Sequence, residues 1–406
     1  MSHLTSSSQN GTRRHSCYLQ GHAPNFFYNE ESLPMIPTLT SETHHADHHL
    51  PAVTCYCHCI ATIEGHNSNI SSMIIGGQFL YTGSSDKEIR LWNRNELSST
   101  FDQEYLADNM VISGNGAVKS MVISADKLFS AHQDHKIRVW KISGPERQQN
   151  KLTYLATLPT LRDRALKLLI PKNHVQVRRH KKSTWVHHLD TVSALALSND
   201  GLLLYSVSWD KTVKIWRTAD YKCLESVANA HDDAINALAL SSNGDVYTGS
   251  ADKKIKVWRK ASEGEDHTVV ATLEKHKSGV NALALSIDEN MLYSGSSDRS
   301  ILVWEKNNDG NTMAVAALRG HTKSILCLNV VSDLVCSGSA DETIRIWRGI
   351  DKLYICLALL EGHSGPVKCL TMERDQDDPS HTSSYLIYSG GLDRDIKVWR
   401  VSIPST

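Results

Sequence analysis

The sequence lacks a strong charge of either sign, a long apolar run and a regular cysteine framework. Its 406 residues carry 43 Lys and Arg against 44 Asp and Glu, which argues against broad electrostatic capture of nucleic acid. No apolar run reaches the length of a membrane span, about 18 residues, and the start of the chain has no signal-peptide core. Nine cysteines without framework spacing indicate a reducing compartment. We therefore expect a soluble protein of the cytoplasm, the nucleus or both.

Signatures of catalysis and of metal binding are also missing. The chain has no phosphate-binding loop and no nucleophile elbow, so the sequence predicts neither an enzyme nor a cofactor. Cys55, Cys57 and Cys59 are the strongest metal candidates. On an extended strand they would lie about 6.6 Å apart on one face, whereas tetrahedral zinc needs sulfurs roughly 3.8 Å apart. We expect them to be small packed side chains, and we assign no metal site to them or to the histidine tract at 44–49.

In place of these signatures the sequence has an internal repeat. Seven segments, such as TVKIW and KIKVW, alternate polar and apolar residues and end in tryptophan, as half-buried strands do. An aspartate stands six positions before each tryptophan, and a serine or threonine stands four positions before each aspartate. Six copies also have an upstream histidine. The repeated residues are His66, Thr82, Asp86, Trp92, Ser130, Asp134, Trp140, His188, Ser206, Asp210, Trp216, His231, Thr248, Asp252, Trp258, His276, Ser294, Asp298, Trp304, His321, Ser337, Asp341, Trp347, His363, Ser389, Asp393 and Trp399.

This pattern resembles the WD-repeat family over residues 54–400. The resemblance implies an all-β fold, a seven-bladed β-propeller of four-stranded antiparallel blades. It also implies that the His, Ser or Thr, Asp and Trp of one blade form a hydrogen-bonded tetrad with a structural role. Gly114 occupies the histidine position of the second copy, so we expect an incomplete tetrad and a looser blade there.

The segment before His66 supplies a strand that the last copy lacks. Only RVSIPST follows Trp399, whereas CHCIATIEGH, ending at His66, aligns with HTVVATLEKH, which ends at His276. We therefore expect residues 54–63 to form the outer strand of the last blade and to close the ring, which removes exposed sheet edges. The expected organisation is a disordered Ser- and His-rich leader at 1–53, followed by a propeller at 54–403.

A basic insertion separates the second and third copies. Thirty positions lie between Leu158 and His188, against three between Leu273 and His276, so 159–187 holds extra sequence. LRDRALKLLI is helix-like and HVQV could be a short strand. The family topology places this loop on the face where partners commonly bind, and an insertion of this length there indicates function. Its candidate partner-binding residues are Arg162, Arg164, Lys167, Arg178, Arg179, Lys181, Lys182 and Trp185.

The residues that precede the turn aspartates should lie on that same face. They are Ser85, Gln133, Trp209, Ala251, Ser297, Ala340 and Leu392. Trp209 is the large aromatic among them, and tryptophan is enriched in binding hot spots. An equally weighted alternative is that Trp209 packs beneath the insertion and holds it in place. Trp209 and Leu392 complete the set of candidate partner-binding residues.

The insertion, with PKNHVQVRRHKKSTWVHH, resembles that of plant WD-repeat proteins of the Jingubang type. This resemblance implies a regulatory adaptor in growth or developmental signalling, such as a negative regulator of pollen germination. We expect a monomeric propeller with protein partners and no membrane span. Binding of nucleic acid or anionic lipid through the insertion remains an alternative, and RRHKK could also be a nuclear-import signal. A ubiquitin-ligase receptor is disfavoured, because none of the seven repeat tryptophans is followed by aspartate.

Overall fold

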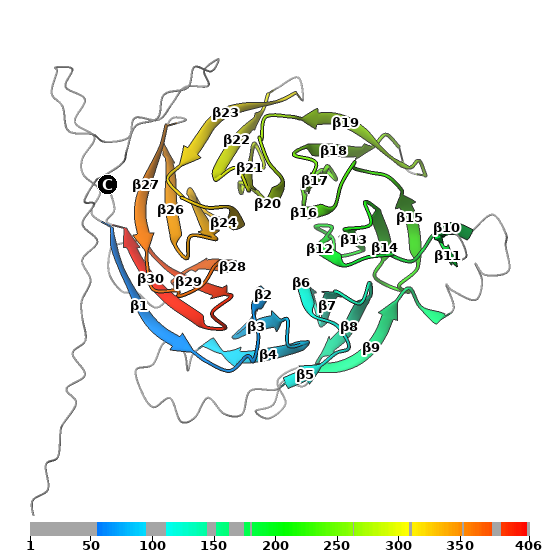
Figure 1. Ribbon diagram of the computed structural model, residues 1–406, viewed down its shortest axis with the longest axis horizontal. Helices are drawn as coiled ribbons and strands as arrows, with labels where there is room; N and C mark the ends of the chain where they lie inside the picture. Colours follow the sequence, from blue (N-terminus) through cyan, green and yellow to red (C-terminus); the bar gives the residue numbers. More distant parts are fainter. Residues whose placement is uncertain are drawn as a thin grey trace, which may run out of the picture.

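Seven four-stranded sheets stand around a common axis in the computed structural model (Figure 1). The structure describes residues 55–94, 111–143, 152–161, 174–178, 181–262, 264–307, 311–350, 353–375 and 383–403. Every sheet is antiparallel, and an eighth, two-stranded sheet lies between the second and third blades in the chain. The all-β, seven-bladed propeller expected from the repeat is therefore confirmed.

The first four blades each follow one strand order, from the strand nearest the axis to the outermost one. Blade 1 contains β2 (Ile70–Gly76), β3 (Phe79–Ser84), β4 (Glu88–Asn93) and β5 (Val111–Ser113). Blade 2 contains β6 (Val118–Ser124), β7 (Lys127–His132), β8 (Ile137–Ile142) and β9 (Leu152–Leu158). Blade 3 contains β12 (Val192–Leu197), β13 (Leu203–Ser208), β14 (Val213–Arg217) and β15 (Cys223–Val227). Blade 4 contains β16 (Ile235–Leu240), β17 (Val246–Ser250), β18 (Ile255–Lys260) and β19 (His267–Leu273).

The last three blades continue this order, and the last one takes its outer strand from the start of the described chain. Blade 5 contains β20 (Val280–Leu285), β21 (Met291–Ser296), β22 (Ser300–Lys306) and β23 (Thr312–Arg319). Blade 6 contains β24 (Ile325–Val331), β25 (Leu334–Ser339), β26 (Ile344–Ile350) and β27 (Leu353–Leu360). Blade 7 contains β28 (Val367–Arg374), β29 (Ser383–Gly391), β30 (Ile396–Ile403) and β1 (Tyr56–Ile63).

The ring is closed by the pairing of β1 with β30. Cys59 lies opposite Trp399 and Ile63 opposite Ile396 in this antiparallel pair. Figure 1 shows the blue strand β1 along the outer side of the red strand β30. The pairing gives β30 a neighbour on both sides, so that the last blade presents no unpaired inner strand to solvent.

Apolar packing is concentrated between neighbouring blades. Each of the seven buried clusters draws side chains from two adjacent sheets. In the cluster between blades 2 and 3, Phe129 and Val139 of one sheet lie with Val192 and Trp216 of the other. Every sheet packs against a neighbouring sheet on each of its two faces. Successive side chains of a strand therefore point alternately into two different buried clusters.

The turns between the second and third strands, called here the Asp turns, share one backbone conformation. The residue after the turn aspartate has a positive φ, between 66° and 75°, in all seven blades. These residues are Lys87, His135, Lys211, Lys253, Arg299, Glu342 and Arg394. The seven Asp turns lie at one end of the blades, called here the turn face.

Candidate functional site

The repeated His, Ser or Thr and Trp residues form hydrogen-bonded chains inside the blades. In blade 1, Trp92 Nε1 donates to Thr82 Oγ1 at 2.8 Å, and His66 Nε2 lies 2.9 Å from the same hydroxyl. His66 Nδ1 lies 2.8 Å from Asp86 Oδ2. The same chain recurs in blades 4 to 7, with histidine–aspartate distances of 2.7 to 2.9 Å. Blade 3 differs slightly, because His188 Nδ1 lies 2.9 Å from Thr212 Oγ1 and 3.5 Å from Asp210.

The turn aspartates also hold the backbone of the turn face. Asp86 accepts hydrogen bonds from the backbone N–H groups of Glu88 and Asn67, at 2.9 and 3.0 Å. Burial alone would raise the pKa of this carboxyl group, but the bonds from His66, Glu88 and Asn67 outweigh burial and lower its pKa to about 2. The balance is the same at Asp252 and Asp393, whose pKa values are also lowered. These carboxylates are therefore ionised structural acceptors at neutral pH.

Blade 2 builds its chain from a histidine that the repeat pattern did not predict. His132 Nε2 lies 2.8 Å from Ser130 Oγ, which accepts from Trp140 Nε1 at 2.8 Å. His132 Nδ1 reaches the carbonyl oxygen of Gly116 at 2.9 Å. Asp134 pairs with Arg138 instead of a histidine. The tetrad of blade 2 therefore lacks its histidine–aspartate bond, as expected from Gly114, but a histidine within β7 replaces the loop histidine at the Ser130 hydroxyl.

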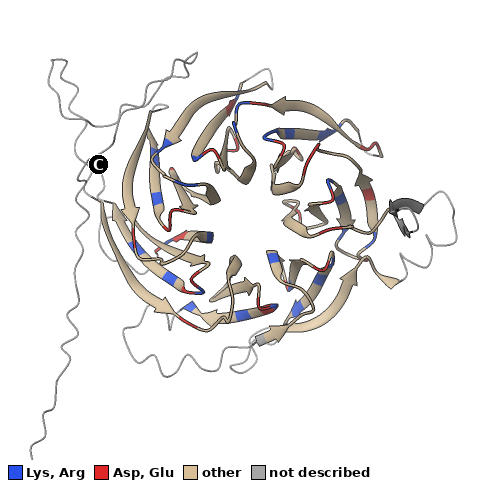
Figure 2. Ribbon diagram, viewed as in Figure 1, with Lys and Arg blue, Asp and Glu red and all other residues tan. Residues whose placement is uncertain are grey.

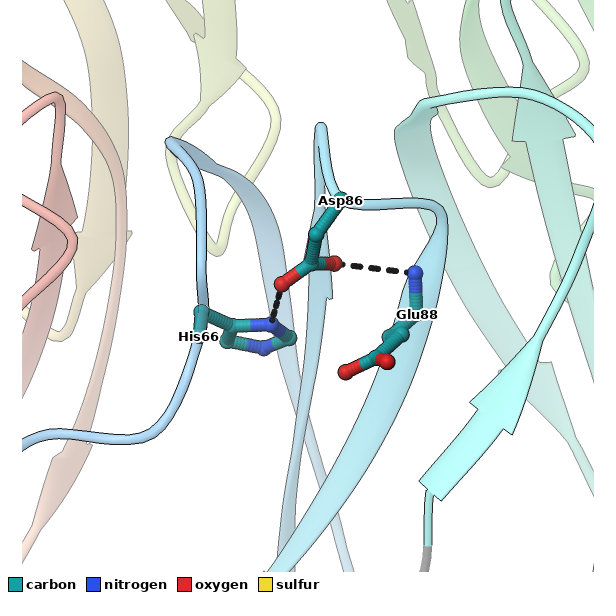
Figure 3. A group of neighbouring side chains, drawn as sticks. All are labelled: His66, Asp86 and Glu88. Atoms are coloured by element: carbon teal, nitrogen blue, oxygen red, sulfur yellow. Dashed lines mark hydrogen bonds and ion pairs between the residues drawn. The ribbon is translucent and has the colours of Figure 1, made fainter.

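One tetrad brings together three side chains of metal-binding type. His66, Asp86 and Glu88 offer ligand atoms within 4.8 Å of one another (Figure 3). Both ring nitrogens of His66 are engaged, by Asp86 and by Thr82. The carboxylate of Glu88 accepts from Arg90 Nε and Nη2, at 3.0 and 2.8 Å. Because these atoms already have hydrogen-bond partners, the group is a tetrad with an adjacent ion pair, and we assign no ion to it.

The three neighbouring cysteines do not share one evenly spaced face. Cys55 Sγ lies 3.3 Å from Cys57 Sγ, and both side chains pack against the cluster between blades 6 and 7. Cys59 is exposed, and its thiol donates to the carbonyl oxygen of Ala61 at 3.3 Å. The expected separation of about 6.6 Å is wrong for Cys55 and Cys57, because Cys55 precedes β1 and the two side chains lean together. The half-buried Cys55 and Cys57 fit the expected packing role, whereas the exposed Cys59 does not.

The residues before the turn aspartates form a ring around the axis on the turn face. In every blade the backbone N–H of this residue donates to the carbonyl oxygen just before the innermost strand, as from Trp209 to Thr191 at 3.0 Å and from Leu392 to Pro366 at 2.9 Å. Trp209 and Leu392 are each 40% exposed. Lys119 Nζ lies 5.9 Å from the centroid of the Trp209 ring. The structure thus places an exposed tryptophan of blade 3 beside a lysine of blade 2.

The insertion contains a β-hairpin, of which the strand at HVQV was expected. β10 (His174–Arg178) pairs with β11 (Lys181–Thr184), and Figure 1 shows the pair beyond the outer edge of the ring near β15. Arg178, Lys181 and Lys182 therefore lie in this hairpin. The helix-like segment and Arg162, Arg164, Lys167 and Arg179 lie outside the described residues.

A tryptophan and a buried lysine anchor the end of the insertion. Trp185 is half-buried against the cluster between blades 2 and 3. Its carbonyl oxygen accepts from Lys214 Nζ at 2.5 Å, and the same ammonium donates to Ser226 Oγ at 2.6 Å. Lys214 is only 1% exposed. Trp185, proposed above as a partner-binding residue, thus packs on the propeller, whereas Trp209 presents its ring to solvent.

None of the helical segments within the described ranges is long and apolar enough to cross a membrane.

The sequence analysis overlooked two lysines of the innermost strands, Lys119 and Lys368. Their signal was present, since VKSM and VKCL stand where other copies read VSAL, INAL or VNAL.

The comparisons with known proteins agree with this architecture. The family described as "WD domain, G-beta repeat" matches residues 57–93, 179–217, 221–259, 267–305, 313–348 and 354–400. The unmatched stretch from 94 to 178 includes blade 2, whose histidine is displaced.

Two curated relatives illustrate the similarity. The chain is 29% identical over 194 residues to the probable cytosolic iron-sulfur protein assembly protein 1 of Chaetomium globosum, covering 44% of this chain and 36% of that protein. It is 25% identical over 217 residues to elongator complex protein 2 of Saccharomyces cerevisiae, covering 53% of this chain and 23% of the relative. The matches therefore span well under two thirds of either relative. Six repeat matches, seven blades and the recurring tetrads together show that the chain belongs to the WD-repeat family.

Proposed function

We propose that this protein is a non-catalytic scaffold that binds partner proteins on the turn face. The observation that carries the proposal is the exposure of Trp209. The seven repeat tryptophans are at most 5% exposed, whereas Trp209 is 40% exposed. When a partner covers a large aromatic ring that is exposed to solvent, the burial stabilises the complex. Tryptophan residues of this kind dominate binding hot spots.

The chemistry of the repeat supports a scaffold over an enzyme. The recurring Ser, His and Asp side chains bond to one another and to buried indole groups. A catalytic serine and histidine would instead face a space that a substrate could enter. The names of the two relatives, an assembly protein and a complex protein, are in keeping with a role in holding proteins together.

The assignment of a more specific role, in plant signalling, rests on the insertion. We place the protein among regulatory adaptors of plant growth or developmental signalling, acting in the cytoplasm or the nucleus. The support is the likeness of the segment around the β10–β11 hairpin to that of the Jingubang type. The basic residues of the insertion, and Trp209 on the turn face, are the contacts we assign to the partner.

The test compares the proteins that copurify with the wild type, with a deletion of residues 160–186, and with Trp209→Ala. We expect a set of partners to be lost from both variants while each keeps its far-ultraviolet circular dichroism and its melting temperature. Tyr56→Ala is the matched control, because Tyr56 is 66% exposed on the outer strand β1. An unchanged partner list in both variants would refute this face as the working surface.

A further inference from the structure

Each innermost strand carries an irregularity at its second residue. The register between the first and second strands shifts at this point in all seven blades. A β-bulge of this kind re-aims the side chain of the extra residue. The seven bulge residues, beside the ring that contains Trp209 and Leu392, are Ser71, Lys119, Ser193, Asn236, Asn281, Leu326 and Lys368.

In four blades the bulge residue joins its blade to the next one. Ser71 Oγ donates to the carbonyl oxygen of Val118 at 2.5 Å, and Ser193 Oγ donates to that of Ile235. Asn236 Nδ2 and Asn281 Nδ2 donate to the corresponding oxygens of Val280 and Ile325, at 3.1 and 2.8 Å. The ordinary role of this position is therefore a hydrogen bond across a blade junction.

Blades 2 and 7 place lysines at this junction position instead. Lys119 and Lys368 stand on either side of blade 1, and Figure 2 shows blue segments on β6 and β28 close to the ring axis. Burial lowers the pKa of Lys119, and the positive charge of Lys368 lowers it further. Strands β6 and β28 both pack against β2, so the two lysines approach the axis from either side of blade 1, where their like charges repel each other. A short polar side chain would have avoided this cost and added a hydrogen bond.

The lysines have no carboxylate partner in the part of the chain that the structure describes. None of the ion pairs there includes Lys119 or Lys368. The turn aspartate of the blade between them, Asp86, is bound to His66. Apolar groups flank the two cations instead, with Trp209 next to Lys119 and Leu392 bonded to the loop that precedes Lys368.

We propose that Lys119 and Lys368 form a receptor for an acidic peptide segment of a partner protein, with Trp209 and Leu392 covering its apolar side chains. Carboxylates of the segment would lie between the two ammonium groups and relieve their repulsion. The order from Trp209 through Lys119 and Lys368 to Leu392 is apolar, cation, cation, apolar, which fits adjacent acidic residues flanked by apolar ones. This inference rests on the proposed scaffold function and names the chemistry of the partner.

The test measures fluorescence anisotropy of a labelled peptide in which two central glutamates are flanked by leucines. The control peptide carries glutamine at each glutamate position. We expect the wild type to bind the glutamate peptide with an affinity that falls as salt is raised. Lys119→Gln and Lys368→Gln should each weaken binding on the order of tenfold. Lys141→Gln should have no effect on binding. Lys141 is exposed near the end of β8 that lies away from the turn face.

Folding is checked by thermal melting of the same variants. Loss of the repulsion predicts that Lys119→Gln melts at or above the wild-type temperature, whereas a structural role for this lysine predicts a fall. Equal binding of both peptides, or full affinity in the double lysine variant, would overturn the proposal. So would tighter capture by anionic lipid vesicles or by single-stranded DNA than by the glutamate peptide. If Trp209→Ala still loses cellular partners in that case, the scaffold function stands and the acidic-peptide inference alone fails.

Discussion

In blade 2 the imidazole of His132 lies 2.8 Å from the hydroxyl of Ser130, two residues earlier on the same strand. In the other six blades the equivalent hydroxyl meets a histidine from the loop before the innermost strand, as Thr82 meets His66. The two arrangements satisfy the same buried serine or threonine and the same indole. Blade 2 therefore keeps the hydrogen-bonded centre of the repeat with a different source of imidazole.

Substitution of His132 should destabilise the propeller as much as loss of a tetrad histidine elsewhere. His132→Ala removes a fully buried ring, leaves Ser130 and the Gly116 carbonyl without their imidazole partner, and should cost roughly 2 to 4 kcal/mol of unfolding free energy. Chemical denaturation measures this change. His135→Ala is the matched control, because His135 is exposed in the Asp turn, and its effect should stay within about 0.5 kcal/mol. Equal midpoints for the two variants would show that the His132 bonds contribute nothing.

Acid should unfold the protein through its turn aspartates. The pKa of Asp86 is about 2 in the folded protein, below its ordinary value of 3.8, so the folded state binds the proton less readily than the unfolded chain. The resulting stability, roughly 2 kcal/mol, is present above about pH 4 and is lost as pH falls through about 2. Melting temperatures measured across this range should decline more steeply for the wild type than for Asp86→Asn. Parallel curves would contradict the assignment.

The buried ammonium of Lys214 should hold the end of the insertion. Lys214→Met leaves the carbonyl oxygen of Trp185 and the hydroxyl of Ser226 without this donor, which should cost about 1 to 3 kcal/mol. We expect trypsin to cleave the insertion faster in this variant, and mass spectrometry would locate the cuts. Lys222→Met is the control, since Lys222 is exposed on the neighbouring turn. Unchanged cleavage in the insertion would argue against the anchor.

Removal of the closing strand should convert a stable ring into an aggregating one. Deletion of residues 1–63 leaves β30 with a free edge and uncovers the cluster that contains Ile63. An unpaired apolar edge recruits other chains, so we expect aggregation in light scattering at concentrations where the full chain does not aggregate. A deletion that stops at residue 54 retains β1 and should behave as the full chain does. A monodisperse 1–63 deletion would show that β1 is dispensable.

The repeat made most of the fold predictable, because the same buried series of hydrogen bonds requires the same residue types at the same positions of each blade. The strings that end in tryptophan located the third strands, and the alignment of the segment before His66 located β1. Sequence periodicity did not reveal His132, because a histidine two positions after Ser130 interrupts the spacing of the pattern. Its role depends on side-chain direction within β7, which spacing alone does not specify.

The candidate binding surface was harder to read from sequence, because it depends on contacts between blades. Trp209 was identified by its place before a turn aspartate, but its contact with Lys119 joins residues of different repeats. Lys119 and Lys368 are far apart in the chain and lie on either side of blade 1 only because the ring is closed. The convergence of Cys55 and Cys57 escaped prediction for a related reason, since strand rise fixes the spacing of Cα atoms and not that of sulfurs.

Closure by β1 also governs when the protein can finish folding during its synthesis. Thr62 of β1 meets Lys397 of β30 across a separation of 335 residues. At roughly 5 to 20 residues per second the ribosome needs on the order of 20 to 70 s to make this interval. The first strand to emerge therefore waits for the last one with its pairing edge exposed. This topology therefore leaves an unpaired strand edge on the nascent chain for the whole of that period.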